Sequence, residues 1–494
     1  MVSATPALEE SLIVFSDVHL GSDIHDGAAR RARRSAEVDR DLIRLLEHYR
    51  AQPPSADRWR IVIAGDFIDF IGMTVTPRPS DLVETSLTDE EQQHGLGSAC
   101  DHARLKLRRV ATRHADVFAA LGRFVAAGNA LTIVHGNHDI EFHWDAVKDD
   151  FRAALFELAR MERRDLDRDV FQSRIEFNPW FFYRDGVAYI EHGHQYDPFC
   201  ATDHIMAPLS PADPRRVARA FCETLLRFVV RPTGMKDHGH EHVGIAYYLR
   251  LGARLGISGG ASLGVRFARA VAEMFRLRRA HFSETAAILR AEHDERVAKL
   301  AEATRVGVER LRALLSLQAP PLGKSIRGIL AGVLLDRLAL ALAATIACIV
   351  LAVYSAFHGH ALWGLAGVLV TWSLLNRWLS RQRTVDPGAN MVERAAHLAR
   401  LFPAAFVVMG HTHVPLAVPA GDATYVNVGS WAEDVADDDD DSAGHPGAGV
   451  PGPYRAARTH LVIHVRADGT HAQFCAWEDS GPRVLPAPAA ARES

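Results

Sequence analysis

The sequence predicts an α/β fold, because short apolar runs alternate with helical patterns along the chain. Five runs are continuous and apolar, as in strands buried on both faces: residues 12–15, 61–64, 131–134, 187–190 and 406–409. Apolar residues recur at helical spacing over 38–49 and 99–127. Each strand-like run ends in a cluster of Asp, Asn or His. Ligands of α/β sheets gather beyond the carboxyl ends of the strands, so we expect these clusters to meet.

The composition limits the class of protein. The 494 residues are 48% hydrophobic, which excludes a disordered chain and suits about two to four domains. Lys and Arg total 56 against 60 Asp and Glu, so no specific nucleic-acid partner is expected. The five cysteines are scattered without C-x-x-C spacing, which disfavours a disulfide framework or zinc ribbon and favours a reducing compartment. The first residues, 1–11, carry no signal-peptide pattern.

The chemistry of the five clusters is that of a site for divalent metals. Asp17 and His19 are two residues apart, so an extended backbone places both on one side, within reach of one cation. Asp66 can bridge two cations through its two carboxylate oxygens. The other predicted ligands are an amide oxygen and three imidazoles, from Asn137, His192, His411 and His413. Mixed oxygen and nitrogen ligands favour manganese, iron or zinc.

Two metals about 4 Å apart are a known clamp for phosphoryl transfer, in which a shared hydroxide attacks in line with the leaving group. His138 follows Asn137 and can protonate the departing oxygen or stabilise the phosphoryl charge. Asp139 is expected to orient that imidazole. We predict His138 and Asp139 as catalytic residues. His194 either orients His192 or contacts substrate, and we predict it to be substrate-binding.

The ordered motifs resemble those of calcineurin-like metallophosphoesterases over residues 12–198 and 395–477. The motifs are Asp17-x-His19, Gly65-Asp66-x-x-Asp69, Gly136-Asn137-His138-Asp139, His192, Gly410-His411-x-His413 and Asn427-x-Gly429-Ser430. The resemblance implies a four-layer α/β/β/α sandwich with two divalent ions, manganese above all. It assigns one ion to Asp17, His19, Asp66 and His413. It assigns the other to Asp66, Asn137, His192 and His411, and catalysis to His138.

Two segments look most like the UDP-2,3-diacylglucosamine hydrolase-like branch of that family: residues 16–21 and His192-Gly193-His194-x-x-Asp197. Enzymes of that branch act on a membrane-embedded lipid diphosphate. The chain departs from the branch at His138, where Arg is common, and in its long insertion.

The insertion separates the two parts of the predicted core. We divide the chain into a first core part (1–204), an Arg-rich helical insertion (205–325), a two-helix membrane hairpin (326–383), a second core part (384–480) and a disordered tail (481–494). Residues 338–357 contain no charged side chain, enough to cross a hydrocarbon core as a helix, and 361–375 form a second uncharged stretch. Basic residues flank both stretches: Lys324, Arg327, Arg337, Arg377, Arg381 and Arg383. This pattern places both ends in the cytoplasm. The alternative is an apolar hairpin buried in a soluble core.

The sequence therefore predicts a binuclear metal-dependent phosphoesterase, anchored in the cytoplasmic membrane with its catalytic domain in the cytoplasm. Its substrate would be a phosphorylated small molecule or lipid. One alternative is a soluble nucleotide phosphodiesterase or nuclease whose insertion mediates oligomerisation. Another is an inactive scaffold of the same fold.

Overall fold

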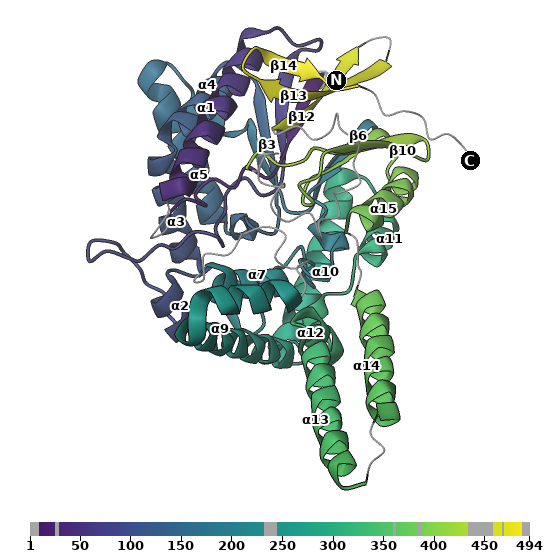
Figure 1. Ribbon diagram of the computed structural model, residues 1–494. Helices are drawn as coiled ribbons and strands as arrows, with labels where there is room; N and C mark the ends of the chain where they lie inside the picture. Colours follow the sequence, from purple (N-terminus) through teal and green to yellow (C-terminus); the bar gives the residue numbers. More distant parts are fainter. Residues whose placement is uncertain are drawn as a thin grey trace.

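The computed structural model describes residues 9–24, 29–231, 245–358, 362–383, 387–432, 458–466 and 469–486. It confirms the mixed α/β class, with parallel and antiparallel strands in two main sheets (Figure 1). The five predicted strands are all present, and they divide between the two sheets. The Gly- and Asp-rich stretch at 434–453 lies outside the described residues.

The larger sheet has seven strands in the order β14-β13-β12-β1-β2-β3-β4. Four neighbouring strands run parallel: β1 (Glu10–Phe15), β2 (Arg58–Ala64), β3 (Ala130–Val134) and β4 (Ile175–Asn178). Three antiparallel strands extend the sheet beyond β1: β12 (Thr459–Arg466), β13 (Gly469–Glu478) and β14 (Gly481–Val484). The strands β12 and β13 form a long antiparallel pair near the C-terminus.

The smaller sheet has five strands in the order β10-β11-β9-β6-β5. Its members are β5 (Phe181–Arg184), β6 (Gly186–Glu191), β9 (Ala404–Met409), β10 (Leu416–Ala420) and β11 (Ala423–Asn427). The central strands β6, β9 and β11 are parallel, although more than 200 residues separate β6 from β9. The insertion therefore interrupts the chain between two strands that pair directly.

Side chains alternate between the two faces of each strand, which explains the continuous apolar runs. In β1, Ile13 and Phe15 join a core cluster with α1 (Ala29–Ala51), α3 (Cys100–Arg113), α4 (Ala115–Ala126) and α5 (Asp145–Glu162). Leu12 and Val14 on the opposite face join a cluster with residues of the smaller sheet such as Ile190 and Val408. The far face of the smaller sheet packs on α10 (Glu284–Thr304), α11 (Val308–Leu317) and α15 (Pro387–Leu401).

The structure corrects three expectations about secondary structure. The predicted helix at 99–127 is two helices that part at His114, whose imidazole bonds to Asp39 and whose backbone leaves the helical region. The helical insertion begins with two short strands, β7 (Leu209–Ser210) and β8 (Asp213–Val217), since Pro211 and Pro214 disfavour a helix there. The start of the predicted disordered tail is β14, and Leu485 beyond it is buried. Residues 487–494 lie outside the described part.

The insertion then forms helices along one side of the core. These are α7 (Phe221–Leu225), the π-helical turn η3 (Leu226–Val230), α9 (Ile245–Ala280) and α12 (Ile326–Gly332). They share one apolar cluster, in which Val229 and Val230 pack with Ile329 and Val333. The same cluster contains Phe199 of the core, so the insertion is anchored beside the loop that follows β6.

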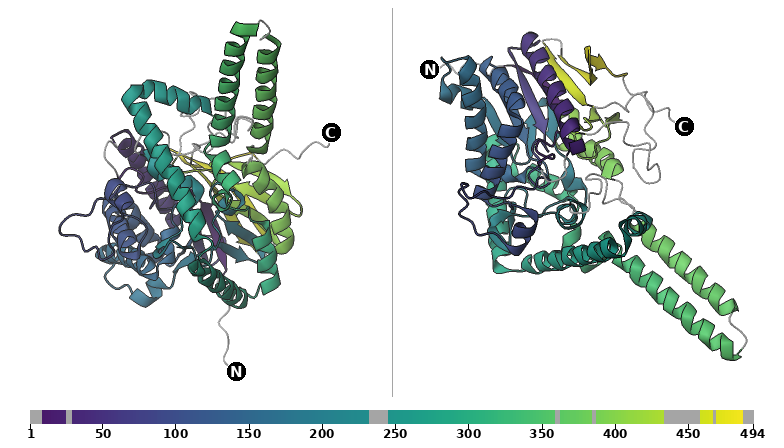
Figure 2. Two further views of the ribbon diagram at one scale, coloured as in Figure 1. Left: turned by 90° about the horizontal axis from the view of Figure 1, so that it is seen from below. Right: turned by 60° about the vertical axis from the view of Figure 1, so that its left-hand side comes forward.

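Two long helices, α13 (Leu335–His358) and α14 (Leu362–Arg383), lie side by side and project away from the rest of the molecule (Figures 1 and 2). We call this pair the arm. Within the described residues, one helix is long and apolar enough to cross a membrane; it covers Leu335–Ser355, with mean hydropathy 2.4 and none of its window buried. Apolar side chains that cover a core elsewhere are exposed on the arm, including Leu342 at 60% and Trp363 at 90%.

Candidate metal centre

The carboxyl ends of β1, β2, β3, β6 and β9 meet at one edge of the two sheets, as the sequence predicts. Backbone hydrogen bonds join the loops that follow them: Asp17 N–H donates to Gly65 O (3.2 Å), and His19 N–H donates to Asp66 O (3.0 Å). His138 N–H donates to Asp66 Oδ1 (2.8 Å). The two sheets are linked here as well, because Gly410 N–H donates to His192 O (3.0 Å).

Asp17, His19 and His413 form one group that could hold a metal ion. His413 Nε2 lies 3.0 Å from Asp17 Oδ1, and His19 Nε2 lies 3.8 Å from the same oxygen. His19 Nε2 is also 3.7 Å from Asp66 Oδ2, so Asp66 borders this group. Asp17 is fully buried and His19 is 2% exposed, so these two side chains lie below the protein surface.

A second group joins Asp66 and His192 to Asp17. His192 Nε2 lies 3.3 Å from Asp66 Oδ2 and 3.1 Å from Asn137 Oδ1. His192 Nδ1 lies 2.9 Å from the carbonyl oxygen of Ala64, which can accept its proton. That bond directs the lone pair of Nε2 toward the oxygens of Asp66 and Asn137. A cation between these atoms would satisfy all three, as would a proton on the ring.

His411 is the one predicted ligand that the structure sets apart from these groups. Its Nε2 lies 3.2 Å from Asp197 Oδ2, and it forms a separate potential metal-binding group with Asp197 and Cys200. The His411 ring centroid is nevertheless 5.2 Å from that of His192. Asp197 therefore fixes the orientation of His411 at the border of the second group.

The backbone is strained at the predicted ligands. Five of them have positive φ, which is uncommon outside glycine: Asp17 (55°), His19 (52°), Asp66 (53°), His411 (70°) and His413 (60°). Such conformations cost about 1 kcal/mol or more each and cluster at functional sites. Within the described residues only three other non-glycine positions share this feature. The strain thus marks the same edge that the motifs mark.

Two glycines permit the close approach of the ligand loops. A Cβ at Gly136 would overlap the Asp66 carboxylate, and a Cβ at Gly65, whose φ is 88°, would overlap the His192 ring. Side chains at these positions would push the ligands apart. Only glycine fits before Asp66 and before Asn137, because no room is left there for a side chain.

Buried carboxylates and imidazoles dominate the electrostatics. Burial alone raises the pKa of Asp66, but the neighbouring His192 and His138 lower it below its ordinary value. The pKa of Asp17 is likewise lowered, by His413 and His192 against the effect of burial. Burial lowers the pKa of His192, yet Asp66 and Asp17 raise it to about 9. The site is built to keep its carboxylates ionised beside positive charge.

Asp69, rather than Asp139, orients His138. His138 Nδ1 lies 2.7 Å from Asp69 Oδ1, and His138 and Asp69 form a further potential metal-binding group with His19. Burial lowers the pKa of His138, but Asp69 and Asp66 raise it to about 10. The Asp139 carboxylate instead accepts backbone N–H groups of Gly136 (2.6 Å) and Phe67 (2.8 Å). The predicted role of Asp139 is therefore wrong, because its carboxylate closes the turn that carries Asn137 and His138.

Asp69 is in turn held by Arg231, a residue of the insertion. Arg231 Nη2 lies 3.0 Å from Asp69 Oδ2, and Gly72 N–H donates to Asp69 Oδ1 (2.6 Å). Arg231 follows the π-helical turn η3, and π-helical turns are frequent at functional sites. The sequence did not identify Arg231, because it is one of many arginines in the insertion and no motif distinguishes it from the others.

His194 is buried (3% exposed) beside the ligands, with its ring centroid 5.4 Å from that of His192. Its Nε2 lies 2.8 Å from the Gln195 side-chain nitrogen, and burial lowers its pKa well below the ordinary value. The ring is therefore neutral and already engaged through Nε2. Contact of His194 with substrate stays a prediction.

The motif Asn427-x-Gly429-Ser430 connects the loops that carry the predicted ligands. Asn427 Nδ2 donates to Gly410 O (2.6 Å), and Ser430 Oγ donates to Asp17 O (3.1 Å). Gly429 supplies a positive φ of 68° and donates to Asn427 Oδ1 (3.0 Å). Asn427-x-Gly429-Ser430 thus joins the ligand loops of the two sheets without supplying a ligand.

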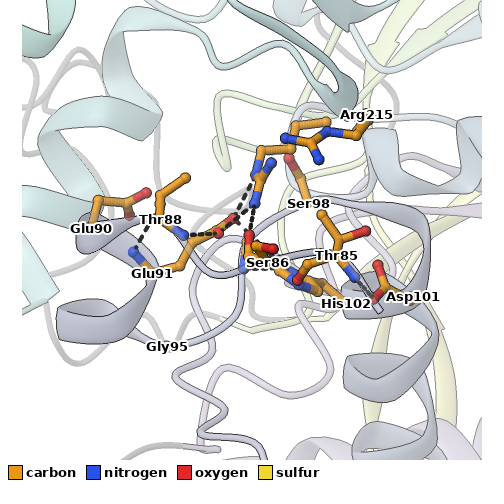
Figure 3. Close-up of polar contacts among 12 residues, drawn as sticks. Thr85, Ser86, Thr88, Glu90, Glu91, Gly95, Ser98, Asp101, His102 and Arg215 are labelled. Atoms are coloured by element: carbon orange, nitrogen blue, oxygen red, sulfur yellow. Dashed lines mark hydrogen bonds and ion pairs between the residues drawn. The ribbon is translucent and has the colours of Figure 1, made fainter. Parts of the chain in front are cut away.

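The first segment of the insertion is fastened to the core by buried ion pairs. The Arg216 guanidinium makes two bonds to the Glu91 carboxylate (2.8 and 2.6 Å). Thr88 N–H donates to the same carboxylate (2.9 Å), as Figure 3 shows. Arg219 and Arg227 both pair with Glu90. These contacts bring residues 216–231 of the insertion against the edge that carries the ligands.

Comparison with known proteins adds no relative: the chain matches no protein-family model and no curated protein. Whether the site can bind a metal must therefore be judged from the side chains that line it. Ligand atoms of buried Asp and His residues lie within 4.8 Å of one another in several groups, so these groups could hold a metal ion.

Proposed function

We propose that the chain is a binuclear metal-dependent phosphoesterase of the calcineurin-like type. The observation that carries the proposal is the convergence of the separate motifs at one buried edge. Asp17, His19 and His413 meet there beside Asp66, Asn137 and His192. In this proposal the two sheets and the helices that cover them are the four-layer sandwich of that family.

The buried donors fit two divalent cations that share Asp66. One would be held by Asp17, His19, Asp66 and His413, and the other by Asp66, Asn137, His192 and His411. When bound, such cations lower the pKa of a water molecule and neutralise phosphoryl oxygens. Among the residues, Ala64 O fixes the tautomer of His192 and Asp197 orients His411.

His138 is the proposed proton donor to the leaving oxygen. The bond from Nδ1 to Asp69 fixes the ring, and we assign the proton transfer to its Nε2. The nearly complete burial of Asp69, at 1% exposure, excludes water from that bond. Asp69 and Arg231 are positioning residues, since they act through His138.

The arm is the proposed membrane anchor. Its apolar side chains are exposed along both helices, and a bilayer would bury them. Arg337 near the start of α13 bonds to Ser380 of α14 (2.6 Å), so the charged ends of the two helices lie together on the side of the catalytic core. In this proposal α13 and α14 cross as a hairpin, with both ends and the core in the cytoplasm. Solubility of the full chain without detergent, with self-association, would favour an oligomerising arm instead.

The proposed activity is tested by a hydrolysis screen on the full chain, extracted in detergent and supplemented with Mn²⁺, Fe²⁺ or Zn²⁺. The substrates are nitrophenyl phosphate mono- and diesters, cyclic nucleotides and lipid-linked diphosphates. We expect metal-dependent hydrolysis of at least one class, and its loss in H138A. Tight metal binding without hydrolysis of any class would indicate an inactive scaffold.

A further inference from the structure

Two cysteines meet where the insertion packs on the core. Cys200 lies in the loop that follows β6, and Cys222 lies in α7. Their sulfur atoms are 2.8 Å apart, and the two residues are buried, at 4% and 5% exposure. Both are thiols in this structure. A contact between two sulfur atoms therefore joins a loop of the core to the first helix of the insertion.

The backbone around the two thiols is held in place by hydrogen bonds. Cys222 N–H donates to the carbonyl oxygen of Phe199 (3.0 Å), the residue that precedes Cys200. Cys200 N–H donates in turn to the carbonyl oxygen of Asp197 (3.0 Å). Phe199 also packs on Phe221, with ring centroids 5.7 Å apart. A disulfide holds its sulfur atoms at about 2.05 Å, so the two thiols need to approach by less than about 1 Å while the main chain stays where it is.

Cys200 lies at the border of the predicted metal centre. It belongs to the group in which ligand atoms of Asp197, Cys200 and His411 are within 4.8 Å of one another, and Cys222 does not. Asp197 is 1% exposed, whereas His411 is partly exposed. The His411 side of Cys200 is therefore the approach for an oxidant as small as hydrogen peroxide. A larger oxidant such as a glutathione disulfide does not fit beside a thiol that is so nearly buried.

We propose that Cys200 and Cys222 are a peroxide-sensitive pair that closes to a reversible disulfide. The Cys200 sulfur attacks one peroxide oxygen and becomes a sulfenic acid; the O–O bond breaks, and the other oxygen leaves as water with the proton of the thiol. The Cys222 sulfur then displaces the sulfenic hydroxyl, which takes the Cys222 proton and leaves as a second water. The two thiols lose two electrons, and one peroxide becomes two water molecules. A thiol reductant reverses the reaction, as is usual for redox-sensing disulfides of reducing compartments.

The disulfide fastens the insertion to the core at a point that only non-covalent contacts hold in the reduced protein. It closes a loop between residues 22 positions apart, and such a cross-link stabilises a fold by restricting the unfolded chain. Through α7 and η3 the linked segment continues to Arg231, which bonds to Asp69. The oxidised protein should therefore melt at a higher temperature than the reduced protein. This inference does not depend on the proposed phosphoesterase function.

The test oxidises the full chain in detergent with a small molar excess of hydrogen peroxide and counts thiols by alkylation after unfolding. The wild type should fall from five alkylated cysteines to three, lose the mass of two hydrogens, and recover all five with dithiothreitol. C200S should lose no thiol. C222S cannot form the disulfide, so dimedone should label the sulfenic acid of Cys200 there but not in the wild type. The control C475S removes a buried cysteine of β13 and should still lose two of its remaining thiols.

Five alkylated cysteines after oxidation of the wild type, or the same loss of thiols in C200S, would overturn the proposal. Equal melting temperatures of the oxidised and reduced wild type would overturn the fastening of the insertion. If C200S or C222S does not fold, peptide mapping of the oxidised wild type decides, because the cross-linked peptides must contain Cys200 and Cys222. A disulfide mapped to any other pair would refute the assignment. None of these outcomes changes the expected hydrolysis by the reduced protein.

Discussion

The edge of the sheets that carries the predicted ligands, here called the metal edge, buries polar side chains, whereas the arm exposes apolar ones. Both arrangements depart from the usual distribution of side chains, in opposite directions. At the edge, carboxylates and imidazoles are almost fully buried, with Asp17 at 0% and His192 at 1% exposure. On the arm, large apolar side chains face outward, such as Val350 at 60%. Neither arrangement is favourable for a chain alone in water. In the proposed function each has a component outside the chain, a cation at the edge and lipid at the arm.

The two regions are also held in place by separate sets of contacts. The edge is held by hydrogen bonds between five loops and by strained backbone at its ligands. Near its base the arm meets the rest of the protein: Leu335 packs against the cluster of α7, η3 and α12, and the Arg327 guanidinium lies over the ring of Trp378. Changes at one region should therefore leave the other intact, and this expectation can be tested from both sides.

The largest effect is expected from Asp66→Ala. Asp66 borders both potential metal groups, so its loss should abolish binding of both ions and all hydrolysis. Metal content measured by plasma mass spectrometry and turnover on the best substrate check this. Membrane partition should not change. Retention of two metal equivalents would contradict the bridging role.

His138→Ala should separate chemistry from metal binding. In the proposed function the imidazole transfers a proton while other residues hold the ions, so metal content should be normal while kcat falls by about 10²- to 10⁴-fold. Asp69→Asn should give a smaller loss with the same metal content. A normal kcat in H138A would exclude a role in proton transfer.

Charges on the exposed face of α13 should act on the arm alone. Leu342, Ile346 and Val350 are spaced by one turn and are each more than half exposed. Lysine at all three positions would cost about 2.5–3.5 kcal/mol each at the centre of a bilayer and should move the protein to the soluble fraction. Metal content and hydrolysis of a soluble ester serve as the control and should persist. A triple variant that still sediments with membranes would show that α13 is not the anchor.

Arg231→Gln is expected to have the smallest effect, because Asp69 keeps its bonds to Gly72 and His138. Loss of the guanidinium should lower kcat by about 10-fold, as is typical for partners that orient a functional group. KM, metal content and membrane partition should stay near wild type. Arg231→Lys should recover part of the rate, whereas equal loss in both variants together with lower thermal stability would indicate a structural role only.

The α/β class and the meeting of the Asp, Asn and His clusters at the strand ends could be predicted from the sequence, because both follow from local patterns. Buried strands are apolar on both faces, and the ligands directly follow them, so Asp17, Asp66 and Asn137 could be found without a structure. Helix boundaries were less predictable, since the break at His114 depends on its contact with Asp39. The orienting residue of His138 was misjudged for a similar reason: Asp139 is adjacent in sequence, but the turn directs its carboxylate to the backbone.

Residues of the insertion could not be assigned, because their roles depend on long-range packing. Cys222 and Arg231 sit in a helical, Arg-rich segment that gives no motif, yet they reach Cys200 and Asp69. Lys106 looks like an ordinary charged residue of α3, although it is 1% exposed. Arg231 and Asp69 are 162 residues apart in the chain, so no local pattern could connect them.

The bond between Arg231 and Asp69 bears on the history of the chain. A segment inserted between two paired strands is often regarded as an accessory that a lineage can gain or lose as one piece. Here the inserted segment holds a side chain that the core uses to position its own acid–base pair. Excision of the segment between β6 and β9 would leave these two strands able to pair but would remove the guanidinium that bonds to Asp69, so in the proposed function the core depends on its insertion.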